Sequence, residues 1–103
     1  MAALAMVPVL DPLPAHSQRS VQVPLECQLH QGLWQPCLLT IVEIGQLWWL
    51  EIGSQRIEFR SDGRGTITLR DPAGNSRLVQ PVWTAQRVLC WDGVCTKGDL
   101  PLD

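Results

Sequence analysis

The amino-acid sequence predicts an all-β protein, a small antiparallel sandwich or barrel of about seven short strands. Two observations lead to this prediction. Apolar and polar residues alternate over much of the chain, which is the pattern of strands with one buried face. Short turns rich in glycine, proline and aspartate separate the alternating runs, and no run has a clear helical period. We therefore expect one domain over residues 19–103, preceded by an extended, proline-containing arm over residues 1–18.

The first expected strand has the most regular alternation in the chain. Its apolar positions are Val21, Val23, Leu25, Cys27 and Leu29. Pro24 lies on the polar face of this strand, but it has no N–H group to donate to a neighbouring strand. The proline therefore favours a position at the edge of the sheet.

Three further strands are expected over residues 38–44, 47–52 and 55–60. The turns between them, Gly45-Gln46 and Gly53-Ser54, begin with glycine and fit two-residue hairpins. Counting back from these turns gives the expected cross-strand pairs, which are Ile41 with Leu50, Trp48 with Phe59, and Glu51 with Arg56. The count also places the large apolar side chains on one face, which we expect to be the core: Leu39, Ile41, Trp48, Leu50, Ile52, Ile57 and Phe59.

Three later turn signals are expected to separate the remaining strands: a three-residue loop over 62–64, a turn over 71–75 and a type I′ turn at Asp92-Gly93. The first of these turns keeps the core face continuous, because it pairs Phe59 with Ile67. The strand between the second and third turns, over residues 77–83, is weaker because Pro81 interrupts it.

The Asp92-Gly93 turn places Cys90 opposite Cys95 in a pair without backbone hydrogen bonds, whose side chains approach closely. Such a pair is close enough for a disulfide, and the alternatives are two reduced thiols or a metal site. A metal would need Cys27 and Cys37 as further ligands, although the cysteine spacing differs from that of zinc knuckles. We expect reduced thiols, with Cys27 isolated in the core as a small apolar residue.

Composition and charge exclude several classes of protein. The net charge is −2 and the basic residues are interleaved with acidic ones, so we expect no nucleic-acid-binding face. No apolar run approaches the ~20 residues needed to span a bilayer. The apolar N-terminus has no basic segment before it and does not resemble a signal peptide. We therefore expect a cytoplasmic protein without a membrane span, in which cysteines stay reduced.

Known catalytic and cofactor motifs are absent from the sequence. The chain has no nucleophile elbow, no paired metal-binding histidines and no phosphate-binding glycine loop. Glu43 falls on the core face of the meander, where its carboxylate either reaches water at the strand end or is a buried functional group. Because an unpaired glutamate is rarely buried, we expect Glu43 to reach water. We also expect no enzymatic activity, no cofactor and no metal.

Tryptophan is the residue type that folding alone does not explain. The chain has five tryptophans, one phenylalanine and no tyrosine. Trp48 and Trp49 are adjacent on a strand and point to opposite faces, so Trp49 lies outside the core that Trp48 joins. Aliphatic residues surround Trp49 and charged residues border it, which is the pattern of an interface. The predicted partner-binding residues are Trp49, Val42, Leu47, Leu38, Glu58 and Arg60.

The favoured hypothesis is therefore a protein-interaction or assembly module that uses the Trp49 side of the sheet, alone or together with the arm. Its partner is another protein or a second copy of the chain, as in a homodimer. The alternative that the arm or another strand covers Trp49 within the chain stays open. A second hypothesis is a small-molecule or glycan-binding barrel with Trp34, Trp83 and Trp91 at its mouth. A third is a redox or metal module built on the cysteine pair of the last hairpin.

Overall fold

The computed structural model describes residues 20–100, and the expected arm over residues 1–18 lies outside this part. The described chain is all-β, as predicted, and has nine strands where about seven were expected. The strands are β1 (Val21–Leu29), β2 (Gln35–Glu43), β3 (Leu47–Ile52), β4 (Gln55–Ser61), β5 (Ile67–Arg70), β6 (Ser76–Val79), β7 (Pro81–Ala85), β8 (Val88–Trp91) and β9 (Val94–Lys97).

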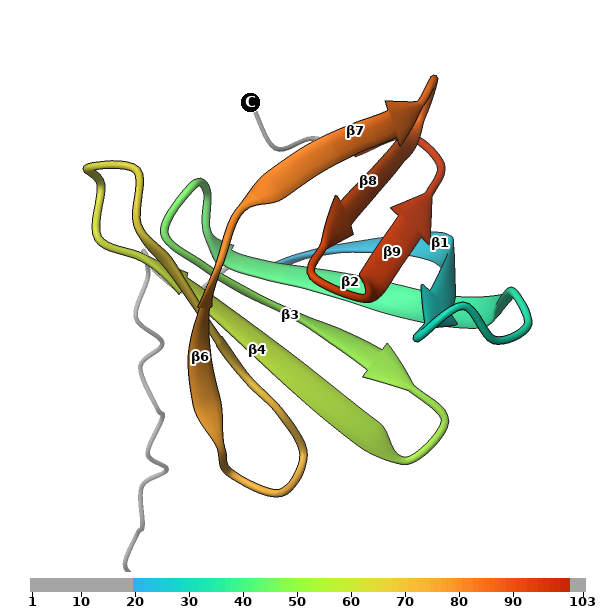
Figure 1. Ribbon diagram of the computed structural model, residues 1–103, viewed down its shortest axis with the longest axis horizontal. Coiled ribbons are helices and arrows are strands. Elements are labelled where there is room, and N and C mark those ends of the chain that lie inside the picture. The colour runs from blue at the N-terminus through green and yellow to red at the C-terminus, as the bar shows by residue number, and fades with distance from the viewer. Residues whose placement is uncertain (1–19, 101–103) are drawn as a thin grey trace, which may run out of the picture.

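The nine strands form one antiparallel sheet in the order β6-β5-β4-β3-β2-β1-β9-β8-β7. The two outermost strands, β6 and β7, are consecutive in the chain and are joined at Gln80. The sheet therefore curls round into a nearly closed barrel whose ends meet at one bent segment (Figure 1). The sequence predicted a single weak strand here. Because Pro81 has no N–H group, the segment stops pairing with β5 and pairs with β8 instead.

The core fills the inside of this barrel. Every apolar residue predicted for the core face of the meander is buried, which confirms the assignment of its two faces. Trp48 stacks on Phe59 with ring centroids 5.6 Å apart, and Trp91 packs against Phe59 at 4.7 Å in a tilted arrangement. Because Trp91 belongs to β8, this cluster joins the C-terminal hairpin to the β2–β4 meander across the barrel.

The predicted register is correct for one hairpin of the meander and wrong for the other. Trp48 pairs with Phe59 between β3 and β4, as expected. Between β2 and β3, however, Ile41 pairs with Trp48 instead of Leu50. A bulge between Ile41 and Glu43 moves the register of residues 38–41 by two positions, which preserves their faces, and it places Glu43 opposite Leu47 on the outer face instead of the core face. Glu43 lies exposed beside this bulge, in agreement with the expectation that it reaches water.

The pairing of β4 with β5 also differs from the prediction by two residues. Phe59 pairs with Leu69 instead of Ile67, so the loop covers residues 62–66 instead of 62–64. An even shift leaves the same side chains pointing inward, and Leu69 is buried in the core as the alternation requires.

An aspartate side chain sets the length of this loop. Asp62 Oδ1 accepts the backbone N–H of Arg64 at 2.7 Å and that of Thr66 at 3.1 Å. These two bonds, with Arg64 contributing most, hold the pKa of Asp62 below its usual value of 3.8. Asp71 binds two backbone N–H groups of the next turn in the same way. Both loops are therefore organised by their first residue, and hydrophobic alternation carries no information about this.

β1 is not an edge strand, in contrast to the expectation based on Pro24. It pairs with β2 over residues 21–27 and with β9 over residues 26–29. Pro24 lies before the segment that pairs with β9, so no strand lies beside it on that side of β1. The missing N–H is therefore accommodated at a local edge within a strand that is otherwise central.

We expect truncations of the core of the meander to cost far more stability than a truncation on its outer face. Leu50 is fully buried and Ile57 is 3% exposed, whereas half of the Arg56 side chain is exposed. Leu50→Ala or Ile57→Ala should lower the free energy of unfolding by about 2–5 kcal/mol. Arg56→Ala should lower it by about 1 kcal/mol or less. Urea unfolding of the three variants measures the difference, and a larger loss for Arg56→Ala would contradict the face assignment.

Candidate functional site

The residues predicted to bind a partner lie together on the outside of the barrel. Leu38 and Val42 come from β2, Leu47 and Trp49 from β3, and Glu58 and Arg60 from β4. The register places Trp49 opposite Glu58, and Leu47 opposite Arg60. Because directly opposed residues share a face of the sheet, Leu47, Trp49, Glu58 and Arg60 lie on one surface, which Leu38 joins opposite Glu51. Val42 lies in the bulge beside this surface, and we call the six together the Trp49 face.

Charged neighbours hold the Trp49 ring in place. Trp49 Nε1 donates a hydrogen bond to Glu51 Oε2 at 3.1 Å, and the Arg56 guanidinium carbon lies 4.1 Å from the centroid of the ring. Arg56 lies between two carboxylates, with N···O distances of 3.9 Å to Glu51 and 4.0 Å to Glu58. Trp49 is therefore half-buried, with a cation over one side of its ring. A side chain that is fixed before binding loses little entropy when a partner arrives.

The residue opposite Trp49 on β2 is the buried Thr40, and not Val42 as the expected register would have it. The aliphatic side chains of the Trp49 face are partly open to solvent. Val42 is 40% exposed and Ile44 is 63% exposed, while Leu38 and Leu47 are half-buried. Residues 20–100 form a single sheet, so no second sheet or helix of the described chain covers this face. The Trp49 face thus combines Trp49 and partly exposed aliphatic side chains with charged residues that contact the ring.

A second apolar site lies at one end of the barrel. A cavity of about 400 Å³ opens there among β3, β4, β5, β7 and β8, and we call it the mouth cavity. None of the residues that line it is charged. Its apolar lining includes Trp48, Trp83, Trp91, Ile67, Leu89 and Leu100.

Two of the three tryptophans predicted at a barrel mouth line this cavity, namely Trp83 and Trp91. The third tryptophan of the cavity is Trp48, which alternation had assigned only to the core. Trp34 lies elsewhere, just before β2, with its ring centroid 5.2 Å from the Lys97 ammonium nitrogen. The sequence therefore predicted that tryptophans line a barrel mouth, but it did not show that Trp48 and Trp91 belong to both the core and the mouth.

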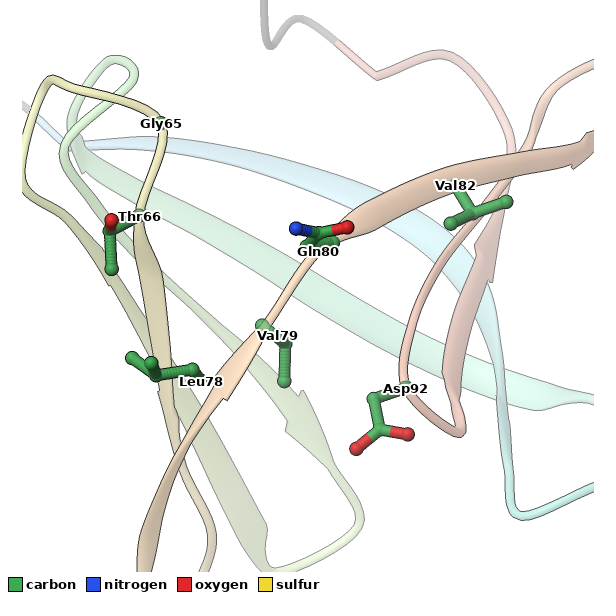
Figure 2. Close-up of a pocket in the computed structure, with 7 residues that line it drawn as sticks. All are labelled: Gly65, Thr66, Leu78, Val79, Gln80, Val82 and Asp92. Carbon is green, nitrogen blue, oxygen red and sulfur yellow. The ribbon is translucent and has the colours of Figure 1, made fainter.

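A further hollow of about 580 Å³ lies at the junction of β6 and β7 (Figure 2). Gln80 lies at the junction itself, and Asp92 faces it from the turn between β8 and β9. The Asp92 carboxylate already has a partner, because Arg77 Nε donates to its Oδ2 at 2.8 Å. Arg77 Nη2 also donates to the Asp92 carbonyl oxygen at 2.9 Å. These contacts tie β6 to the last hairpin where the two ends of the sheet meet.

All four cysteines are in disulfides, so the expectation of reduced thiols was wrong. Cys90 is bonded to Cys95, and the two are paired as the Asp92-Gly93 turn predicted. Cys27 is fully buried as expected, but it is bonded to Cys37 and is not isolated. The pairing of β1 with β2 brings the two Cα atoms within 5.8 Å. One feature of the sequence could have predicted this disulfide: Cys37 is on the inward-facing side of β2, as Cys27 is on that of β1.

The described residues offer little other chemistry. A cysteine in a disulfide has no thiolate with which to bind a metal. In residues 20–100, no three His, Cys, Asp or Glu side chains gather where they could hold a metal ion. The same residues include no helix long and apolar enough to cross a membrane. Comparison with protein-family models, curated proteins and solved structures finds no match to this chain. The Trp49 face and the mouth cavity are therefore the two candidate functional sites.

We expect the two disulfides to contribute unequally to stability. Cys27 and Cys37 are ten residues apart, and Cys90 and Cys95 are five apart. The chain-entropy model then gives about 3 kcal/mol for the first disulfide and about 2 kcal/mol for the second. Replacing Cys90 and Cys95 by serine should preserve the fold at that smaller cost, whereas replacing the buried pair by alanine should cost more. Urea unfolding without reductant compares the variants, and the reverse order would contradict this ranking.

Proposed function

We propose that the protein is an interaction or assembly module that binds another protein, or a second copy of itself, through the Trp49 face. One observation carries the proposal. Trp49 is a fixed, half-buried side chain at the centre of an outer face that no described layer covers. The buried core consists of inward-facing side chains and does not include Trp49, so folding does not require a tryptophan on the outer face. Tryptophan is enriched among the residues that dominate binding at the centres of interfaces.

The charges at the border of the Trp49 face favour a second copy as the partner. Along β4, Arg56, Glu58 and Arg60 alternate in sign on the outer face. In a two-fold dimer the same patch meets itself, and an axis that passes beside Phe59 would place Glu58 of one copy opposite Arg60 of the other when the strands run antiparallel. An acidic patch or a basic patch alone would repel itself, whereas this alternating border is self-complementary.

The mouth cavity favours a second candidate function, the binding of a small molecule. A cavity of about 400 Å³ is within the size range of ligand sites, and three tryptophans line it. The hydrogen-bonding side-chain groups of the lining are few: the Ser61 hydroxyl and the indole N–H of Trp83, besides the indole N–H groups of Trp48 and Trp91, which are buried. An apolar ligand therefore fits the lining better than a glycan, whose hydroxyl groups need several polar partners.

We further propose an oxidising compartment, in place of the cytoplasm expected from the sequence. The support is the pair of disulfides, which use all four cysteines of the chain. Cytosolic thiols are kept reduced, whereas disulfides persist in secreted and periplasmic proteins. Thiol labelling of the protein in intact cells tests this proposal: full labelling without reductant would place the protein in a reducing compartment.

Trp49→Ala is expected to weaken association and to leave the fold nearly intact. If Trp49 is the central contact, its loss should weaken self-association by about 2 kcal/mol or more, which is about a 30-fold change in the dissociation constant. Sedimentation equilibrium measures the dissociation constant, and thermal unfolding of the same samples measures stability. Leu33→Ala is the matched control, because Leu33 is apolar and 86% exposed but lies outside the Trp49 face.

Two results would count against the Trp49 face as an interface. One is a large fall in melting temperature for Trp49→Ala with unchanged association, which would mean that the face is an internal layer covered by another part of the chain. The other is an equal loss of association in Leu33→Ala and Trp49→Ala.

A further inference from the structure

The two ends of the barrel differ in how well their inward-facing residues are covered. At the end that holds the mouth cavity, Trp83 is 60% exposed and Val21 is 47% exposed. Both belong to the inner face, because they pair with the buried residues Leu89 and Ile41. At the other end, the apolar inward-facing residues Ile52, Ile57 and Val94 are buried and Leu29 is half-buried. One end of the barrel therefore leaves apolar area in water that burial would stabilise by about 25 cal/mol per Å².

β7 has an unpaired edge next to this exposed area. Trp91 and Val94 close a two-residue hairpin and so exchange backbone hydrogen bonds. By alternation Cys90 turns its N–H and C=O towards Val82, its partner on β7. Trp83, the next residue, then directs its N–H and C=O away from β8, to the side where β7 has no neighbour in the sheet. This edge offers the N–H and C=O groups of Trp83 to an extended segment, next to the exposed Trp83 side chain.

The chain enters the barrel at this same end. Val21 pairs with Ile41, and Ile41 pairs with Trp48, which lines the mouth cavity. Two strand spacings of about 4.8 Å put the start of β1 about 10 Å from the backbone of Trp48. An extended chain advances ~3.3 Å per residue, so a few extended residues are long enough to span the distance from the start of β1 to the mouth cavity.

The sequence before β1 matches the chemistry of the cavity. Residues 4–14 read Leu-Ala-Met-Val-Pro-Val-Leu-Asp-Pro-Leu-Pro and carry one charge, at Asp11. The cavity lining carries none. Proline disfavours helix and favours extended backbone, and aromatic-lined grooves are the usual receptors of such segments. Covalent attachment also raises the local concentration of this segment to the millimolar range.

We propose that residues 4–14 of the chain dock in extended form along the free edge of β7 and place apolar side chains in the mouth cavity against Trp83. The docked segment covers the exposed inner face at the open end of the barrel. It also competes with any free apolar molecule for the same cavity. This proposal is independent of the Trp49 face, which lies on the outside of the barrel.

The test uses the full chain and follows the indole signal of Trp83 by NMR, assigned with Trp83→Phe. Nuclear Overhauser contacts are expected between the Trp83 ring and the methyl groups of Val9, Leu10 or Leu13. Leu10→Asp should abolish these contacts, shift the Trp83 signal and lower the melting temperature by several degrees. Ala15→Asp adds the same charge outside the docking segment and should change none of these. A synthetic peptide of residues 4–14 should return the Trp83 signal of Leu10→Asp towards its original position.

Three outcomes would overturn the proposal. The first is a Trp83 signal that Leu10→Asp leaves unchanged. The second is contacts that run only between labelled and unlabelled molecules in a mixed sample, which would assign the segment to a second copy. The third is contacts from Trp83 to a retained small molecule instead of to the chain. Loss of self-association with an unchanged Trp83 environment would bear on the Trp49 face alone.

Discussion

The packing of Trp91 against Trp48 and Phe59 is the interaction on which the rest of the barrel depends. Antiparallel pairing runs from each strand to its sheet neighbours, so it cannot fix the C-terminal hairpin over the meander. Trp91 makes that connection through the inside, at 4.7 Å from Phe59 and 6.3 Å from Trp48. The Arg77–Asp92 contact supports it only at the rim, where both side chains are partly exposed and an ion pair contributes little. The aromatic cluster therefore supplies the main interaction that stabilises the closed form of the sheet.

The faces of the strands could be predicted from the sequence, but several registers could not. Both errors of register are of two residues, as for Ile41 and Phe59, because an odd error would turn core side chains outward. The hydrophobic pattern therefore fixes the parity of a register and leaves its value to the turn. Here the turns are set by a bulge before Glu43 and by the bonds of Asp62. The alternation of apolar and polar residues predicts neither the bulge nor the hydrogen bonds of Asp62.

Pairings between segments far apart in the chain were the other limit. That β1 lies between β2 and β9, and that β6 and β7 lie at opposite ends of the sheet order, follow from barrel closure. A local reading of Pro24 or Pro81 identifies a place where pairing is lost on one side, but it does not say which strand lies on the other. The Cys27–Cys37 disulfide was missed for the same reason, since it depends on the pairing of β1 with β2. By contrast, the Cys90–Cys95 pairing is local to one hairpin and was predicted.

The two apolar surfaces differ in a way that suggests different occupants. Trp49 is satisfied by its surroundings: its N–H is bonded to Glu51 and its ring carries Arg56, so it can stay in water until a partner arrives. Trp83 is 60% exposed, and no cation–π contact or side-chain hydrogen bond to it occurs among the described residues. A surface whose polar groups are paired in the unbound state suits a partner that binds reversibly, since the unbound protein must also be stable. A bare inward-facing ring suits an occupant that is always present, and a segment of the same chain meets that condition.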